Sequence, residues 1–313
     1  MKLRNVLGVA AGTVGFTAVA NRLLTARAGE FEPFLEGDHD TYRWRGFDIA
    51  YTEAGDPGDP DLLLLHGINA AASAHEFARV FGALSEDYHV VAPDLPGFGH
   101  SDRPPLLYSA SLYATFAGDA IEDLTGEQPV VVASSLSGAY AAMGAREADV
   151  ERLVLVCPTD TSMGGRRTWL RSVLRTPVLG QGLFNLTASK RAIRYFHADH
   201  GYYDTANLTD EVVGYEWTTA HQSGARFAPA SFVSGFLDPE EDLDDVLADL
   251  AVPTTLVWGR EADITPLSEG RTLARRADAR LVVFDDSLLL PHVEHPDQFV
   301  DVVRGEGPAE TDG

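Results

Sequence analysis

The sequence has very little lysine and almost no cysteine. Only Lys2 and Lys190 are lysines among 24 basic residues, and 47 acidic residues bring the net charge to −23. Such a surface repels the phosphates of nucleic acids, so the composition argues against a nucleic-acid-binding protein. The single Cys157 excludes an internal disulfide and makes a cysteine-based metal site implausible. Because Cys157 follows an apolar run, we expect it to be a buried structural thiol.

A composition with few lysines and many acidic residues is typical of a halophilic protein, and we expect an archaeal source. Concentrated salt screens the repulsion between like charges that would strain such a chain in dilute buffer. The alternative interpretation is an acidic protein encoded by a GC-rich genome. The 313 residues are enough for one large α/β domain with a well-buried core.

No apolar run is long enough to be a clear membrane span. Residues 6–20 carry no charge and follow Lys2 and Arg4, which is compatible with a signal peptide, a short membrane anchor or a helix packed on the folded domain. We expect segment 1–30 to contain a helix over residues 5–24 that directs an otherwise cytoplasmic protein to the membrane. The polar tail at 306–313 is predicted to be disordered.

From residue 41 onward, short apolar strands alternate with helical patterns. The strands are expected at 41–45, 47–52, 62–65, 89–92, 129–133, 153–156, 253–258 and 281–284, with intervening helices at 74–84, 111–124, 138–147, 267–277 and 295–303. Continuous apolar strands indicate a parallel sheet that is buried on both faces. A mostly helical stretch at 159–249 interrupts this rhythm. The sequence therefore predicts one α/β domain over 31–305, with a mostly parallel doubly wound sheet and an inserted helical cap.

Ser135 lies where a strand passes directly into a helix. Such a turn leaves no space for large side chains two residues before and after the serine, and Ala133 and Ser137 occupy those positions. A serine hydroxyl held in this way becomes a nucleophile when a base removes its proton and N–H donors stabilise the oxyanion.

Several further segments resemble the α/β-hydrolase superfamily in order and spacing over residues 41–303. They are the His66–Gly67–Ile68–Asn69 loop, the D-x-P-G-x-G-x-S-x-x-P segment at 94–104, the strand ending Trp258–Gly259, and Pro291–His292–Val293–Glu294 with Pro296. The residues around His66 and Ser135 are most similar to those of a little-characterised branch seen in cyanobacteria and halophilic archaea.

The resemblance implies a role for particular residues. Ser135 would be the nucleophile, and the backbone N–H groups of Ile68 and Leu136 would form the oxyanion hole. His66 and Asp94 would support loops rather than take part in catalysis. A serine at position 135 excludes the aspartate nucleophile of dehalogenases and epoxide hydrolases.

Both expected partners of the serine are out of register. The usual acid lies three residues after the glycine of its strand, where this chain has Ala262, and the nearest aspartate is Asp263. The usual histidine lies five residues before Glu294, where this chain has Leu289, and the nearest histidine is His292. Short insertions could restore both, which makes His292 the candidate base and Asp263 the candidate acid. Asp160, after strand 153–156, is an alternative acid.

The histidines of the cap carry less information. His197, His200 and His221 occur among aromatic residues, which favours a pocket wall over a metal site. Asn185 and Asn207 lie in glycosylation sequons, which matter only outside the cell.

Two functions fit these observations. The first is a metal-independent, cofactor-free serine hydrolase that cleaves an ester of a hydrophobic small molecule through an acyl-Ser135 intermediate. The second is a catalytically impaired protein that keeps the pocket and binds a hydrophobic ligand. The intact turn at Ser135 favours the enzyme, and the two register shifts favour the binding protein.

Overall fold

The computed structural model describes residues 3–162 and 164–306, with side chains from residue 15 onward. Eight strands form one sheet in the order β1-β2-β4-β3-β5-β6-β7-β8, and only the pairs β1–β2 and β2–β4 are antiparallel. The strands are β1 Asp38–Trp44, β2 Phe47–Ala54, β3 Asp61–Leu65, β4 His89–Pro93, β5 Val130–Ser134, β6 Arg152–Val156, β7 Thr254–Gly259 and β8 Arg280–Phe284. The predicted doubly wound sheet is confirmed.

The central strands are buried on both faces, as their continuous apolar sequences require. Leu62 pairs with Val130 and Leu65 with Ala133, so β3 and β5 run side by side and end at the same edge. Because parallel strands deliver their following loops to one edge, the loops after β3, β5 and β7 meet there.

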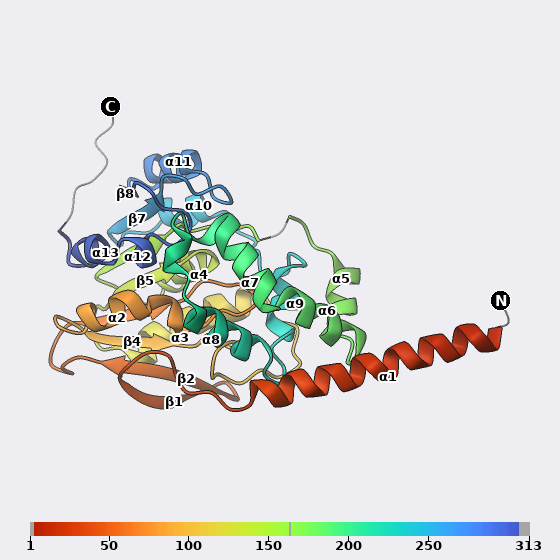
Figure 1. The fold of residues 1–313 in the computed structure, drawn as a ribbon. Helices are drawn as coiled ribbons and strands as arrows, with labels where there is room; N and C mark the ends of the chain where they lie inside the picture. The colour runs from red at the N-terminus through yellow and green to blue at the C-terminus, as the bar shows by residue number, and fades with distance from the viewer. Residues whose placement is uncertain (1–2, 163, 307–313) are drawn as a thin grey trace.

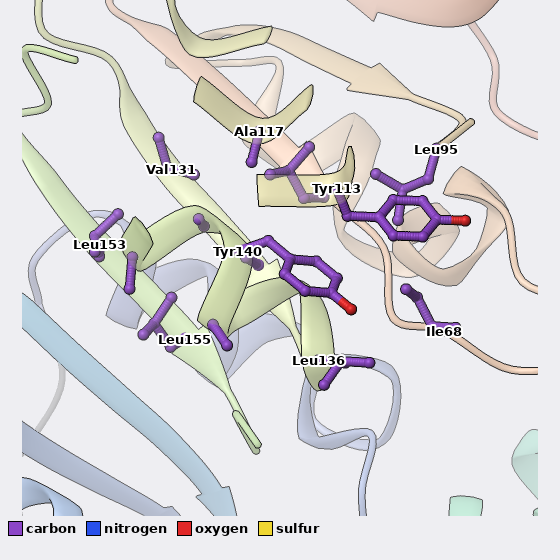
Figure 2. Close-up of a cluster of buried hydrophobic side chains, with 14 of the residues drawn as sticks. Ile68, Leu95, Tyr113, Ala117, Val131, Leu136, Tyr140, Leu153 and Leu155 are labelled. Carbon is purple, nitrogen blue, oxygen red and sulfur yellow. The ribbon is translucent and has the colours of Figure 1, made fainter. Parts of the chain in front are cut away.

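Helices cover both faces of this sheet (Figure 1). They are the 3₁₀ turn η1 Ala74–Phe77, α2 Ala78–Leu84, α3 Ala110–Leu124, α4 Leu136–Gly144, α10 Leu243–Ala248, α11 Leu267–Ala277, α12 Pro291–Glu294 and α13 Pro296–Val303. Helices α3 and α4 pack against each other over the larger apolar cluster, which Figure 2 shows around Tyr113 and Tyr140. These two rings stack with centroids 5.5 Å apart.

The interruption at 159–249 is a helical cap, as expected. Its elements are α5 Thr168–Leu174, α6 Leu179–Thr187, α7 Lys190–Phe196, the π-helical turn η2 His197–Gly201, the 3₁₀ turn η3 Thr205–Asn207, α8 Asp210–Ala220 and α9 Phe227–Phe232. Helix α10 falls inside the expected cap range but packs on α4 and α11, and its Leu243, Val246 and Leu247 join the main core. The sheet layer therefore resumes before residue 249.

The N-terminal segment is a helix, α1 Leu3–Ala28, which extends away from the rest of the molecule (Figure 1). Its C-terminal half lies against α6, where Asn21 donates to the carbonyl of Val178 at 3.0 Å. Within the described residues, no helix is both long and apolar enough to cross a bilayer. The expected disordered tail lies outside the described residues, apart from Glu306.

Helices α3 and α4 approach so closely because glycines meet at their crossing. A Cβ atom added to Gly144 would lie 2.7 Å from the backbone nitrogen of Gly118 and 3.0 Å from its Cα atom. Both neighbours are backbone atoms, so a side chain at 144 would force the two helices apart. This contact holds α4, and therefore Ser135 before it, in position against the sheet.

We predict that Gly144→Ala lowers the free energy of unfolding by about 1–3 kcal/mol, because an overpacked helix crossing cannot relax without backbone movement. The matched control is Gly82→Ala in α2, where an added Cβ atom meets nothing within 4 Å. That change removes backbone freedom from the unfolded chain and should raise stability by up to about 1 kcal/mol. Denaturant unfolding of both variants in the same salt provides the measurement, and equal effects of the two changes would contradict the prediction.

Candidate active site

Ser135 occupies the strained turn between β5 and α4. Its backbone has φ 54° and ψ −128°, a conformation that residues with a Cβ atom adopt rarely and at a cost. The turn is fixed by a hydrogen bond from the Ser135 N–H to the carbonyl of Val156 at 2.8 Å. Strain of this kind, enforced by neighbouring strands, projects a side chain above the sheet edge.

The loop after β3 lies directly against this turn. Ser137 Oγ donates to the carbonyl of His66 at 2.6 Å, and a Cβ atom on Gly67 would lie 3.3 Å from Ser134 Oγ. His66 is buried and accepts from the N–H of Leu95 through Nε2, so its proton is on Nδ1, which donates to the Gly67 carbonyl at 2.7 Å. His66 is therefore a loop support, as the sequence indicated.

Asp94 is also a loop support. Its two carboxylate oxygens accept from the N–H groups of Ala74 at 2.8 Å and His100 at 2.7 Å. Cys157 is buried as expected, and burial raises the pKa of its thiol to about 12, which leaves it protonated and unreactive at neutral pH.

A cavity of about 70 Å³ lies above Ser135. Its walls come from the β3 loop, the β5 turn, the cap and the loop after β8: Gly67, Ile68, Asn69, Glu76, Ser134, Ser135, Cys157, Phe196, His197, Gly201, Leu289 and Leu290. Ile68 lies in this wall, and Leu136 is the first residue of α4, whose N–H is one of the donors that a helix leaves unpaired at its start. Figure 2 shows both residues near the N-terminal end of α4.

His292 lies beneath this cavity rather than in its wall. Its ring is fully buried between Phe77 and Phe299, and Nε2 is 3.3 Å from Glu76 Oε1. Neither ring nitrogen forms a hydrogen bond within the described structure. The structure thus does not join His292 to Ser135, because the buried Glu76 carboxylate takes the position beside its ring.

The candidate acids also have other partners. Asp263 lies 3.0 Å from His200 Nδ1, so it fastens the loop after β7 to the cap instead of orienting His292. Asp160 accepts from the N–H of Leu243 at 2.7 Å and holds the start of α10. Neither carboxylate is brought to Ser135.

Apolar side chains occupy the register positions of the usual triad. Leu289 lies in the wall of the Ser135 cavity, and Ala262 is buried in the core cluster. Neither position therefore supplies a titratable side chain to the cavity.

A histidine from the cap lies in the cavity wall instead. His197 is buried, and its Nε2 lies 2.8 Å and 3.0 Å from the two carboxylate oxygens of Glu216 in α8. Nε2 therefore donates to the carboxylate, and Nδ1 is a buried nitrogen without a hydrogen bond in the described structure. Gly201 makes room for it, since a Cβ atom there would lie 2.7 Å from His197 Nδ1.

His75 approaches the same carboxylate. Its Nε2 is 3.2 Å from Glu216 Oε1, and its Nδ1 is 2.7 Å from Ser73 Oγ. Sequence reasoning assigned His197 to a pocket wall and gave Glu216 and Glu76 no role. The only sequence signal for the pair of His197 and Glu216 was Glu216 itself, an acidic residue in a helix that was assigned to the cap.

The two buried carboxylates are ionised. Burial alone would raise the pKa of Glu216, but hydrogen bonds from His197 and His75 outweigh it and lower the pKa to about 2. For Glu76, burial is likewise outweighed by contact with His292, and its pKa is also about 2. Glu76 Oε2 accepts from the Gly67 N–H at 2.9 Å, which ties this charge to the β3 loop.

The remaining cap histidines have structural partners. His200 pairs with Asp263, and His221 Nδ1 donates to the carbonyl of Trp217 at 2.7 Å. Among the described residues, the one cluster with metal-ligand spacing is Asp242, Asp244 and Asp245, and Arg276 already forms ion pairs with two of these.

Known proteins share this fold. A model of the alpha/beta hydrolase family matches residues 62–302, so the chain belongs to that family. The pimeloyl-[acyl-carrier protein] methyl ester esterase of Aeromonas hydrophila is 27% identical over 252 residues, covering 78% of this chain and 94% of the esterase. The 2-hydroxymuconate semialdehyde hydrolase of a Pseudomonas strain is 28% identical over 267 residues, covering 80% of this chain and 87% of that hydrolase.

A solved structure adds evidence for the fold. A membrane phospholipase A described as a bacterial virulence factor superposes with a TM-score of 0.68 at 22% identity, covering 97% of this chain and 95% of that one. The Aeromonas and Pseudomonas relatives are thus named as an esterase and as a hydrolase.

We predict that Glu216→Gln lowers the free energy of unfolding at neutral pH and that its effect fades in acid. Because the folded-state pKa of about 2 lies below the ordinary 4.5, the ionised carboxyl stabilises the fold fully above pH 4.5. This stabilisation, of order 3 kcal/mol at 1.36 kcal/mol per pKa unit, is lost as the pH falls from 4.5 to 2. Denaturant unfolding across this range measures it. Glu211→Gln, an exposed change in the same helix, is the matched control and should show a difference near zero.

Proposed function

We propose that this protein is a serine hydrolase that cleaves an ester of a hydrophobic small molecule through an acyl-Ser135 intermediate, without a metal or cofactor. The observation that carries the proposal is the strained turn at Ser135, which faces a cavity lined by His197, whose Nε2 lies 2.8 Å from Glu216 Oε1 behind it. Strain at a buried turn has a cost in stability and is retained where it positions a reactive group.

The base in this proposal is His197, oriented by Glu216. His197 Nδ1 lacks a hydrogen bond in the described structure, and the ring shares a cavity with Ser135 that has room for about two water molecules. A general base acts directly or through one water, and in this proposal a water in the cavity would link Ser135 Oγ to His197. The negative Glu216 then stabilises the imidazolium that forms, as the triad acid does in serine hydrolases.

The chemical steps balance with water as the second substrate. Ser135 Oγ bonds to the ester carbon as its proton passes to His197 Nδ1, and the N–H groups of Ile68 and Leu136 receive the oxyanion. The ester C–O bond breaks, and His197 returns the proton to the leaving alcohol. Water then repeats the sequence and releases the acid. His75 also contacts Glu216 Oε1 and contributes to the low pKa that keeps the carboxylate ionised.

The substrate class follows from the adjoining space. A second cavity of about 210 Å³ shares Asn69, Glu76, His197 and Leu290 with the first, and its other walls include Phe34, Val212 and Val293. The same wall also contains His75, Arg79 and Glu216, so the cavity joins an apolar side to a polar one. Such a cavity suits a short hydrophobic group attached to an ester. Relatives named as a methyl ester esterase and a semialdehyde hydrolase support an ester or a related carbonyl substrate.

The second candidate is a binding protein without catalysis. Leu289 in the cavity wall and Ala262 at the acid position favour it, because they remove the triad that the family uses. The two functions differ in whether Ser135 is activated, and this difference is directly measurable.

We expect a fluorophosphonate probe to label Ser135 without added metal, and Ser135→Ala to abolish labelling. Labelling needs a nucleophile whose proton is removed by a base. Mass spectrometry of the labelled peptide identifies the site, and Ser137→Ala is the matched control, since its hydroxyl is bonded to the His66 carbonyl. If the protein is folded but resists the probe, the serine hydrolase is excluded and the ligand-binding function remains.

The identity of the base is tested by the rate of labelling. We expect His197→Ala to slow it by about 10²–10⁴-fold, the usual contribution of a general base, and Glu216→Gln to slow it less. His292→Ala and Asp263→Asn are the corresponding variants of the sequence-derived pair, and a circular dichroism spectrum checks that each is folded. If His292→Ala slows labelling while His197→Ala does not, the base is His292, and the role proposed for His197 of the cap is wrong.

A further inference from the structure

The charges of this protein are strongly segregated along the chain. Residues 1–29 and 161–196 contain no acidic residue, and together they hold 11 of the 24 basic residues. The rest of the chain therefore carries 13 basic and 47 acidic residues, a net charge of −34, while these two segments carry +11. A uniformly acidic surface selected only for solubility would not leave two long segments without a single acid.

The two segments come together in the fold. Helix α1 lies along α6, and Asn21 accepts from the side-chain amide of Asn185 at 3.0 Å while donating to the Val178 carbonyl. A Cβ atom on Gly182 would lie 2.8 Å from the Thr17 side chain, so the helices touch closely. Figure 1 shows α1 running past α6 and continuing beyond it, with α5 on the other side of α6.

The same segments expose most of the large apolar side chains on the described surface. Ten of the fourteen lie in them: Phe16, Val19, Leu23, Trp169, Val173, Leu179, Leu183, Leu186, Tyr195 and Phe196. Phe16 is 77% exposed, Leu186 70% and Trp169 67%. We call the exposed side chains of residues 15–29 and 161–196 the basic apolar face. Large apolar side chains that gather on the surface of a monomer mark a site that meets a partner.

Several cations of this face have no acidic partner. Among the described residues, Arg22, Arg27, Arg167 and Arg191 are exposed and form no ion pair. Arg166 and Arg194, by contrast, pair with Glu240 and Asp210. Unpaired cations interspersed with exposed leucine, phenylalanine and tryptophan match the lipid interface, where apolar side chains enter the acyl boundary and basic ones meet anionic headgroups.

We propose that the basic apolar face docks on the surface of an anionic lipid bilayer. Charge complementarity selects this partner, since the remaining −34 is repelled by anionic headgroups and turns the molecule so that α1, α5 and α6 face the lipid. The apolar side chains then enter the interface without crossing it, which agrees with the lack of a membrane-spanning helix among the described residues. Salt weakens the attraction between the basic side chains and the anionic headgroups. The burial of the apolar side chains in the interface persists, because it does not depend on charge.

Sedimentation with lipid vesicles tests the apolar part of this proposal. The full chain should bind phosphatidylglycerol vesicles better than phosphatidylcholine vesicles at low salt, with no catalysis required. The combined variant Phe16→Ser, Leu23→Ser and Trp169→Ser should weaken binding to both by at least about tenfold, because three large apolar side chains leave the interface. Ile264→Ser, an exposed apolar residue outside both segments, is the matched control and should bind as the wild type does.

A charge reversal tests the electrostatic part. Arg22→Glu with Arg167→Glu should weaken binding to phosphatidylglycerol vesicles at low salt and have little effect on phosphatidylcholine. Arg275→Glu with Arg271→Glu makes the same change in net charge on α11 and should leave binding unaltered. Equal losses in both double variants would show that only net charge matters and would overturn the proposal.

A second copy of the chain is the competing occupant of this face. If light scattering shows a wild-type dimer that the serine variants dissociate while vesicle binding is unchanged, the face is a protein interface and the proposal is wrong.

Discussion

The close approach of two backbone segments at the sheet edge is the constraint on which this site depends. The loop after β3 must pass within van der Waals distance of the turn after β5, and Gly67 leaves the space for it. On the other side, a Cβ atom on Gly138 would lie 2.9 Å from Pro158, so the start of α4 is equally confined. Small residues on both sides let the strained Ser135 conformation persist, because no side chain can relax it without breaking contacts between β3, β5 and β6.

The fold was accessible from the sequence because its signals are local. Continuous apolar strands such as Leu62–Leu65 and the small residues around Ser135 depend on burial and turn geometry that act within a few residues. The family match over residues 62–302 confirms the same architecture. The end of the cap was harder to place, since α10 has a helical pattern like the cap but packs on the sheet layer.

The contacts between polar side chains around the cavity could not be predicted from the sequence in the same way. Glu216 meets His75 across 141 positions of chain and His197 across 19, and no spacing rule links a cap helix to the loop after β3. By spacing, the sequence predicts Ala262 and Leu289 where the resemblance places the acid and the histidine, and this register stays a prediction. The sequence could not show that Glu76 would take the position beside His292, because that contact depends on how η1 and α12 pack.

The leucine at position 289 limits the proton chemistry that the cavity can support. Leu289 lies in the wall of the Ser135 cavity, where its side chain offers neither a base nor a hydrogen-bond donor. Burial keeps the Cys157 thiol in the same wall protonated. The titratable side chains of the wall that can accept a proton are therefore Glu76 and His197, so a proton released inside the cavity passes to one of these two groups or to water.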